Sequence, residues 1–152
     1  MIHLLPGSAD EILASELREA GILTPDVVER IDATLGRPEH CLLDDFLLSG
    51  AGFIRTNEWL SWLIRRHGCH RFGRVVRPVD GSAWTGIGMP ADGNIPYRLC
   101  ADGRLLVAVL RPDKLQATFE RLKDSRPLWA AATLREIGDL RTSLSAFCPE
   151  LP

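Results

Sequence analysis

The chain has 152 residues, of which 45% are hydrophobic and 25% charged, and its formal net charge is −2. This composition is typical of a soluble globular protein built as one domain or two small subdomains. The near-neutral charge argues against nucleic acid as a partner, and no apolar run approaches the roughly 18 residues that a membrane-spanning helix needs. We therefore expect no nucleic-acid binding and no direct membrane insertion.

The first predicted helix begins at a capping box. Ser8 and Glu11 have the spacing at which a hydroxyl and a carboxylate each satisfy a backbone N–H at a helix start. The apolar stripe that follows consists of Ile12, Leu13 and Leu17. Gly21 stands where a left-handed residue is expected to end the helix.

A second helix is predicted from Thr24, which supplies the cap, and Pro25, which suits the first helical position. Its buried face is expected to contain Val27, Val28 and Ile31. Glycine and proline within residues 36–38 end this helix. The two helices together predict an antiparallel helical hairpin.

Two further helices are predicted before residue 70. A short one covers residues 42–48 and ends at residues 49–50, and a longer one is capped by Thr56 and ended by Gly68. Apolar residues nearly encircle the longer helix, which predicts a central position: they are Trp59, Leu60, Trp62, Leu63 and Ile64. Segments 17–26 and 46–58 share a pattern of helix, glycine, apolar step, threonine and helix, and so predict two stacked hairpins.

Residues 78–96 interrupt this pattern with clustered glycine and proline, as in a connection between subdomains. Trp84 lies within the connection. An exposed tryptophan there would be a binding anchor, and the alternative is that it holds the loop against the body of the protein. Both interpretations stay open from the sequence.

The second half predicts strands and helices in the order β-β-α-β-α. Strands at residues 95–100 and 104–110 flank the turn signal at residues 101–103, which predicts a hairpin. The second strand is apolar at every position of residues 105–110, as expected for a strand buried on both faces. Pro112 then suits the first turn of a helix.

That helix is predicted over residues 113–123, with Leu115, Phe119 and Leu122 on one face. A short strand at residues 128–132 is expected to join the same sheet. Thr133 and Glu136 form a second capping box before the final helix. The apolar residues of the final helix in helical register are Leu134, Ile137, Leu140, Leu144 and Phe147.

The predicted fold class is therefore α+β. We expect a helical subdomain of two helical hairpins at residues 1–77 and a connection at residues 78–96. A small α/β subdomain of order β-β-α-β-α is expected at residues 97–152.

Neither a metal site nor an active site is expected. The thiol and imidazole groups that could bind zinc are those of His40, Cys41, His67, Cys69 and His70. They lack the two closely spaced ligand pairs that such sites use, and the simpler interpretation is a helix end with surface imidazoles. No G-x-S-x-G and no G-x-x-x-x-G-K-[ST] occurs, so we expect no enzyme and no cofactor.

A basic run lies between residues 59 and 79, which contain no acidic residue. Its arginines are Arg65, Arg66, Arg71, Arg74 and Arg77. Arginine forks suit phosphate, so the run is a candidate anion or nucleotide site. The alternative, which we favour, is the basic end of a helix that continues into a solvated linker, because the aromatic residues needed for base stacking are sparse.

Four features follow one another along the chain: the Ala-Gly21-Ile-Leu-Thr-Pro hairpin, its second copy at residues 50–63, the Arg111-Pro-Asp sequence after the buried strand, and the closing helix that begins at Thr133. Together they resemble the N-terminal domain of type II secretion and type IV pilus assembly ATPases, which is also found attached to some bacterial glycosyltransferases. The resemblance covers residues 9–147. The Arg-Leu-Gly that opens the family's cyclic di-GMP motif is absent from both copies.

The resemblance implies a non-catalytic, cytoplasmic domain at the inner face of the bacterial inner membrane. Its partner would be the cytoplasmic part of an inner-membrane secretion protein or the parent protein's own downstream catalytic domain. The alternative that the family offers is a sensor of cyclic di-GMP or another anionic nucleotide. The family's binding positions fall here on Leu17, Gly21, Leu48 and Gly52, or on Phe46 and Gly50 for the second copy in another register.

Overall fold

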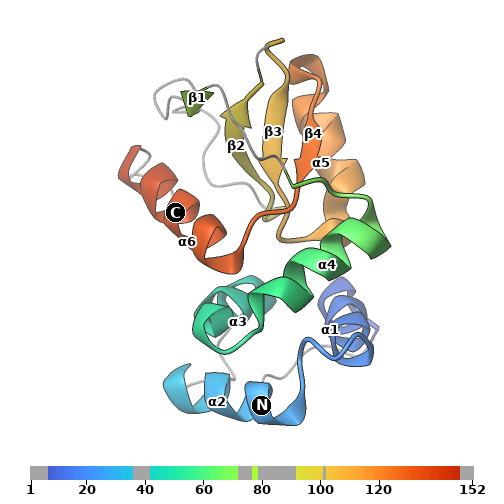
Figure 1. Ribbon diagram of the computed structural model, residues 1–152, viewed down its shortest axis with the longest axis vertical. Coiled ribbons are helices and arrows are strands. Elements are labelled where there is room, and N and C mark those ends of the chain that lie inside the picture. Colours follow the sequence, from blue (N-terminus) through green and yellow to red (C-terminus); the bar gives the residue numbers. More distant parts are fainter. Residues whose placement is uncertain (1–6, 36–41, 72–76, 79–91, 101, 148–152) are drawn as a thin grey trace.

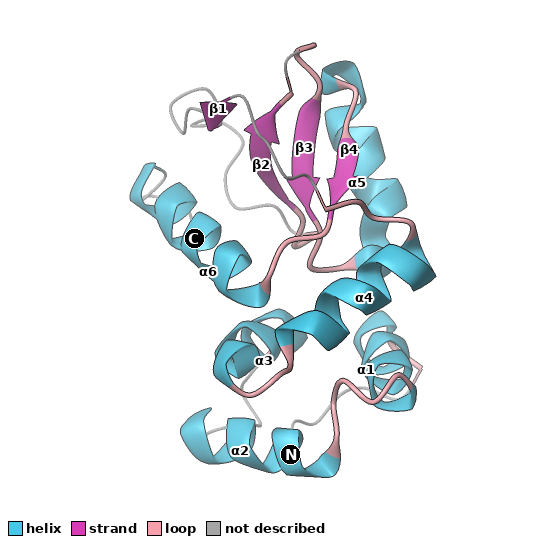
Figure 2. Ribbon diagram, viewed as in Figure 1, coloured by secondary structure: helices cyan, strands magenta, loops and turns pink. Residues whose placement is uncertain are grey.

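A computed structural model describes residues 7–35, 42–71, 77–78, 92–100 and 102–147 (Figure 1). The described chain is mixed α+β, which confirms the predicted class. Its helices are α1 (Ala9–Glu19), α2 (Pro25–Leu35), α3 (Leu43–Ser49), α4 (Thr56–His67), α5 (Leu115–Leu122) and α6 (Leu134–Phe147). Its strands are β1 (Arg77–Pro78), β2 (Ile95–Leu99), β3 (Leu105–Ala108) and β4 (Leu128–Ala130). Figure 2 shows the strands gathered at one end of the molecule, with α1, α2 and α3 at the other.

The strands form one sheet in the order β1-β2-β3-β4. β2 and β3 are antiparallel, with Leu99 opposite Leu105, and Gly103 makes their tight turn at a φ of +85°. β4 pairs with β3 in parallel, with Leu106 opposite Leu128. The predicted hairpin and the predicted return of the last strand to the same sheet are both confirmed.

The apolar run at residues 105–110 is fully buried, with no residue more than 1% exposed. β3 itself ends at Ala108, two residues earlier than predicted. Neighbouring strands pair with both of its edges. Leu105 and Val107 belong to one buried cluster with Leu122 of α5, whereas Ala108 belongs to the main core. This burial confirms the prediction made from a run that is apolar at every position.

The ends of α1 and α2 follow the predicted signals. The Ser8 hydroxyl accepts a hydrogen bond from the Glu11 N–H at 3.2 Å. At the other end Gly21, with a φ of +76°, donates to the Arg18 carbonyl, and Ile22 donates to the Leu17 carbonyl at 3.0 Å. This pair of bonds is the Schellman arrangement, which requires a left-handed residue and therefore favours glycine.

The first residues of α2 and α6 are capped as predicted. The Thr24 hydroxyl accepts from the Val27 N–H at 3.3 Å. The Thr133 hydroxyl accepts from the Glu136 N–H at 3.0 Å, and the Glu136 carboxylate accepts from the Thr133 N–H at 2.9 Å. The second capping box is thus complete.

Four details of the predicted helices are wrong. Ile12 is 61% exposed because it lies one residue, or about 100° around the helix, from the face that contains Leu13. Phe119 is 44% exposed for the same reason, since its neighbour Thr118 takes the inward position on α5. Ile64 is 41% exposed, so α4 is not surrounded on all sides. Finally, Thr56 is the first residue of α4, and no side chain caps that helix end.

The two repeated segments do not share one turn conformation. Gly21 is left-handed, whereas Gly50 has a φ of −82° and begins a 3₁₀ turn, Gly50–Gly52. A Cβ atom on Gly50 would lie 2.6 Å from Ile31 Cδ1 and 2.8 Å from Ile54 Cδ1. Glycine is needed at position 50 because neighbouring side chains approach it closely, whereas at position 21 the backbone conformation requires it.

One hydrophobic core contains residues from both sides of segment 78–96. Leu17 on α1, Trp59 on α4 and Ile137 on α6 are each fully buried in it. The indole N–H of Trp59 donates to the Ala132 carbonyl at 3.0 Å, so the central helix is tied to the chain just after β4. Trp62 is also buried, as predicted.

Several predictions lie outside the described residues. They concern Trp84, residues 36–38, most of the connection at residues 78–96, and the side chains of Leu144 and Phe147.

Candidate functional site

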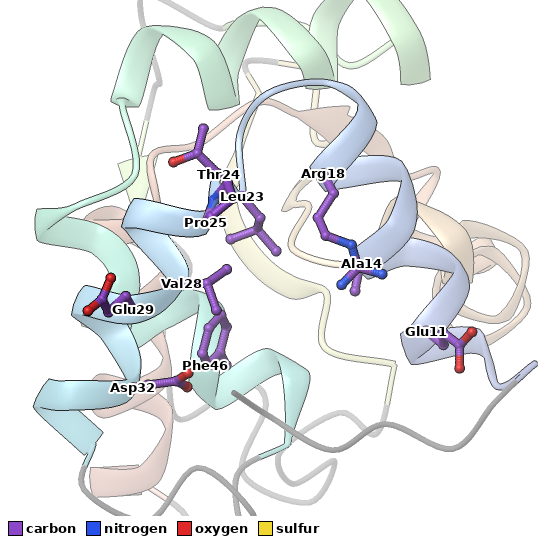
Figure 3. Close-up of a pocket in the computed structure, with 10 residues that line it drawn as sticks. All are labelled: Glu11, Ala14, Arg18, Leu23, Thr24, Pro25, Val28, Glu29, Asp32 and Phe46. Carbon is purple, nitrogen blue, oxygen red and sulfur yellow. The ribbon is translucent and has the colours of Figure 1, made fainter.

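A groove of about 650 Å³ lies between α1 and α2 (Figure 3). Its volume lies within the range of known ligand sites. Ten residues line it: Glu11, Ala14, Arg18, Leu23, Thr24, Pro25, Val28, Glu29, Asp32 and Phe46. Phe46 comes from α3, which closes the groove from below, and the other residues come from α1, α2 and the turn between them.

The floor of the groove is apolar. Ala14, Leu23 and Phe46 are buried there, and Val28 is half-buried. In Figure 3 the side chains of Leu23 and Val28 project from the α2 side into the space that faces α1. A ligand with an apolar face would remove this floor from water, which is the main source of favourable binding free energy.

The rim of the groove is mostly acidic. Glu11 stands on the α1 wall, and Glu29 and Asp32 stand on the α2 wall. Arg18 is the basic residue of the lining, and its guanidinium donates to the Ser15 hydroxyl at 3.3 Å. The rim therefore carries three carboxylates and one guanidinium, which favours a cationic ligand over an anionic one.

The family motif positions do not meet in this groove. Leu17 is fully buried, and its carbonyl accepts from the Ile22 and Leu23 N–H groups. Together with Gly21 it shapes the turn at one end of the groove without lining it. Gly52 is exposed, with open space where a Cβ would be.

The second-copy positions are equally dispersed. Leu48 lines a separate hollow of about 490 Å³ between α3 and α6, beside Asp45 and Arg141. In the other register, Phe46 lines the main groove, whereas Gly50 packs against Ile31. Phe46 is the one motif position of either register that contributes a surface to the groove.

The basic run does not converge on one point. Arg66 lies 3.6 Å from the Glu16 carboxylate on α1, and Arg71 donates to the Glu136 carboxylate on α6 at 2.8 Å. Arg65 is exposed on α4. The side chains of Arg74 and Arg77 lie outside the described residues. The part of the favoured interpretation that concerns a solvated linker lies outside the described residues.

Two of the described candidate metal ligands are an imidazole beside a carboxylate and a buried thiol. His67 Nε2 lies 2.6 Å from Glu16 Oε1, and Cys69 is buried. Burial raises the pKa of the Cys69 thiol to about 11, which disfavours the thiolate that metals bind. Within the described ranges no group of three or more His, Cys, Asp or Glu side chains could hold a metal ion. His40 and Cys41 lie outside those ranges.

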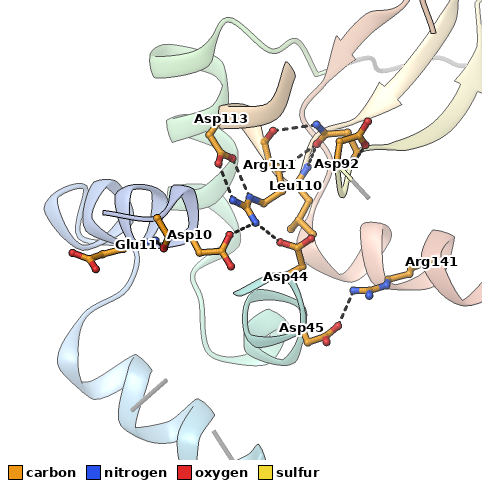
Figure 4. Close-up of polar contacts among 11 residues, drawn as sticks. Asp10, Glu11, Asp44, Asp45, Asp92, Leu110, Arg111, Asp113 and Arg141 are labelled. Atoms are coloured by element: carbon orange, nitrogen blue, oxygen red, sulfur yellow. Dashed lines mark hydrogen bonds and ion pairs between the residues drawn. The ribbon is translucent and has the colours of Figure 1, made fainter. Parts of the chain in front are cut away.

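A buried arginine that sequence reasoning missed lies next to the groove. Arg111 is 2% exposed, and its guanidinium contacts three carboxylates (Figure 4). Nη1 lies 2.8 Å from both Asp10 Oδ1 on α1 and Asp44 Oδ1 on α3. Nε and Nη2 donate to the two oxygens of Asp113 at 3.0 and 2.8 Å. We call these four residues the Arg111 clamp.

The Arg111 guanidinium is positively charged under all ordinary conditions. Burial by itself would lower the pKa of Arg111, but the hydrogen bonds and negative charges of Asp113 and Asp44 raise it above the usual arginine value. Through Asp10 and Asp44 this guanidinium joins α1 and α3 to the segment that follows β3. The sequence signal for the clamp was the Arg111-Pro-Asp113 segment after the buried strand. The distant partners of Arg111, Asp10 and Asp44, could not be predicted from that segment.

Asn94 completes the buried polar centre beside the clamp. Its amide oxygen accepts from the Leu110 and Arg111 N–H groups, both at 2.9 Å. Its amide nitrogen donates to the Arg111 carbonyl at 3.1 Å and to the Thr118 hydroxyl at 2.8 Å. All four hydrogen-bonding positions of this side chain are satisfied, so the segment before β2 is held in one position.

Comparison of the chain with protein-family models gives no match, and comparison with curated proteins gives none either. In the part of the chain that the structure describes, no helix has both the length and the apolar character to cross a membrane. The hydroxyl of the groove lining is that of Thr24, which accepts a hydrogen bond from the Val27 N–H and caps α2.

Proposed function

We propose that the chain is a non-catalytic docking or regulatory domain, of the type found in secretion ATPases or attached to glycosyltransferases, that binds another protein. The observation that carries the proposal is the apolar groove between α1 and α2, of which the α1 wall and the supporting helix α3 are anchored to the rest of the fold. The Arg111 clamp anchors α1 through Asp10 and α3 through Asp44. A groove held in this way loses little entropy on binding, which favours recognition.

The proposed partner is the cytoplasmic part of an inner-membrane secretion protein, or the catalytic domain that follows in the parent protein. Either partner would place the domain in the bacterial cytoplasm at the inner face of the inner membrane. The proposal includes a helical subdomain at residues 1–77, a connection at residues 78–96 and an α/β subdomain at residues 97–152. It requires no cofactor and no nucleic acid.

A sensor of cyclic di-GMP or another anionic nucleotide has less support. The carboxylates at the groove rim would repel phosphate, and two arginines of the basic run already pair with Glu16 and Glu136. Arg65 and Arg18 are exposed, and Arg18 belongs to the groove lining.

Pull-down of cytoplasmic domains of secretion-platform proteins, and of the parent's downstream domain, tests the proposal. We expect one of them to bind the folded chain and the parent protein to lose activity or regulation when residues 1–152 are deleted. Absence of binding, together with full activity of the deleted parent, would refute it. Calorimetric titration with cyclic di-GMP separates the alternative, which predicts saturable binding weakened by Arg65→Ala.

A further inference from the structure

The groove between α1 and α2 points to a particular class of partner. We infer that it binds an amphipathic helix that carries lysine or arginine on both flanks of its apolar face. This inference rests on the proposed docking function and adds the chemistry of the partner.

The shape of the groove favours a helix. Its two walls are neighbouring helices, and side chains of a third helix pack into the space between two such ridged surfaces. α1 has 11 residues, or about 16 Å at 1.5 Å per residue, so a partner helix of about three turns would lie along it. Apolar side chains at positions i, i+3, i+4 and i+7 of such a helix would cover the floor near Val28 and Phe46.

The charges of the groove favour a basic helix. Glu11 is half-buried on the α1 wall and Glu29 is exposed on the α2 wall, so a bound helix would have a carboxylate on each flank. Lysines or arginines on both flanks would meet these groups, whereas a helix with acidic flanks would be repelled. A nucleotide or another anion would meet the same repulsion.

Fluorescence anisotropy with a synthetic probe tests this inference on the intact chain. The probe is a labelled peptide of about 18 residues, long enough to form a helix, with leucines at positions i, i+3, i+4 and i+7 and lysines on both flanks. A second peptide has glutamate in place of every lysine. We expect the lysine peptide to bind, with an affinity that falls as salt rises, and the glutamate peptide to bind at least tenfold more weakly.

The variant Glu11→Gln/Glu29→Gln removes both rim charges and keeps the side-chain shapes. We expect its affinity for the lysine peptide to be about fivefold lower, as for two partly exposed ion pairs. The matched control is Glu58→Gln/Glu120→Gln, which removes two exposed carboxylates from α4 and α5 that do not line the groove. The control should bind like the unmodified protein, and circular dichroism should show all variants folded.

Three outcomes would overturn the inference: no binding of the lysine peptide, equal binding of both peptides, or equal losses in the rim variant and its control. Dimerisation that excludes the peptide, measured by sedimentation, would assign the groove to a second copy of the chain and also overturn it. The pull-down tests the docking function independently of the peptide experiment. If a protein partner binds in the pull-down and the rim variant retains that binding, docking stands and the groove is not its site.

Discussion

Replacement of Arg111 by alanine should destabilise the protein more than any exposed charge substitution. The change removes a buried guanidinium and leaves the carboxylates of Asp10, Asp44 and Asp113 close together. Loss of one partner from a buried ion pair costs about 3–5 kcal/mol in the free energy of unfolding. The three carboxylates remain 19–29% exposed and can regain water, so we expect the lower end of this range, about 3 kcal/mol.

Urea unfolding monitored by tryptophan fluorescence measures this loss directly. A loss of about 3 kcal/mol lowers the urea midpoint by about 1.5 M at a slope of about 2 kcal/mol/M. The melting temperature should fall by about 6–12 °C for a chain of this size. Arg111→Lys should be intermediate, because one ammonium cannot reproduce the fork that contacts three carboxylates.

The control for Arg111→Ala is Arg30→Ala. Arg30 pairs with Asp26 at 3.3 Å, but both side chains are more than 60% exposed. Its removal should change stability by less than about 0.5 kcal/mol. If Arg111→Ala also costs less than about 1 kcal/mol, the clamp does not hold α1 and α3 to the sheet. A double-mutant cycle with Asp44→Asn should then show no coupling, whereas we expect about 1–3 kcal/mol.

Three other substitutions test the polar centre, the second capping box and the buried thiol. Gly93→Ala should lower the free energy of unfolding by about 3 kcal/mol, because φ is +75° and the new Cβ would lie 2.8 Å from a carboxylate oxygen of Asp44. Gly7→Ala, where φ is +77° but the space is open, should lower it by about 1 kcal/mol. Equal losses of the two variants in urea unfolding would contradict this prediction. In the same assay, Thr133→Ala should lower the free energy of unfolding by about 1 kcal/mol, because the Thr133 hydroxyl caps α6. Thr56→Ala should change it hardly at all, because no side chain caps α4. A larger loss for Thr56→Ala than for Thr133→Ala would refute the capping assignment. The pKa of the Cys69 thiol is 9.0 in the unfolded chain and about 11 in the folded protein, because burial disfavours the thiolate. The stability that the protonated thiol allows is therefore fully present below pH 9.0 and is lost as the pH rises towards about 11. Cys69→Ala should therefore show a shallower alkaline decline in unfolding free energy, and an unchanged decline would exclude this role for the thiol.

Local signals predicted most of the secondary structure. Ser8, Gly21, Thr24 and Thr133 act through hydrogen bonds to residues at most five positions away, so their effects could be read directly from the chain. The fully apolar run at residues 105–110 likewise predicted a strand buried on both faces. Such signals are reliable because the interacting groups are neighbours in sequence.

Two of the errors, at Ile12 and Phe119, came where neighbouring positions competed for one buried place. Ile12 and Leu13 are both apolar, and the periodicity alone did not show that only Leu13 faces the core. On α5 the inward place belongs to Thr118, a polar residue, because its hydroxyl meets the buried Asn94 side chain. The direction of a helix face depends on what packs against it, which a local pattern does not contain.

The candidate site depended almost entirely on tertiary structure. The motif positions Leu17 and Gly21 were identifiable from sequence, but the groove beside them is made by α1, α2 and Phe46 of a third helix. In the Arg111 clamp, Arg111 lies 67 positions after Asp44 and 101 positions after Asp10 in the sequence. The sequence by itself determined where most helices and strands lie and how α1, α2 and α6 begin, because those signals act over a few residues. Only the fold decided which charges became partners and which apolar surface stayed open, because packing between distant segments creates both.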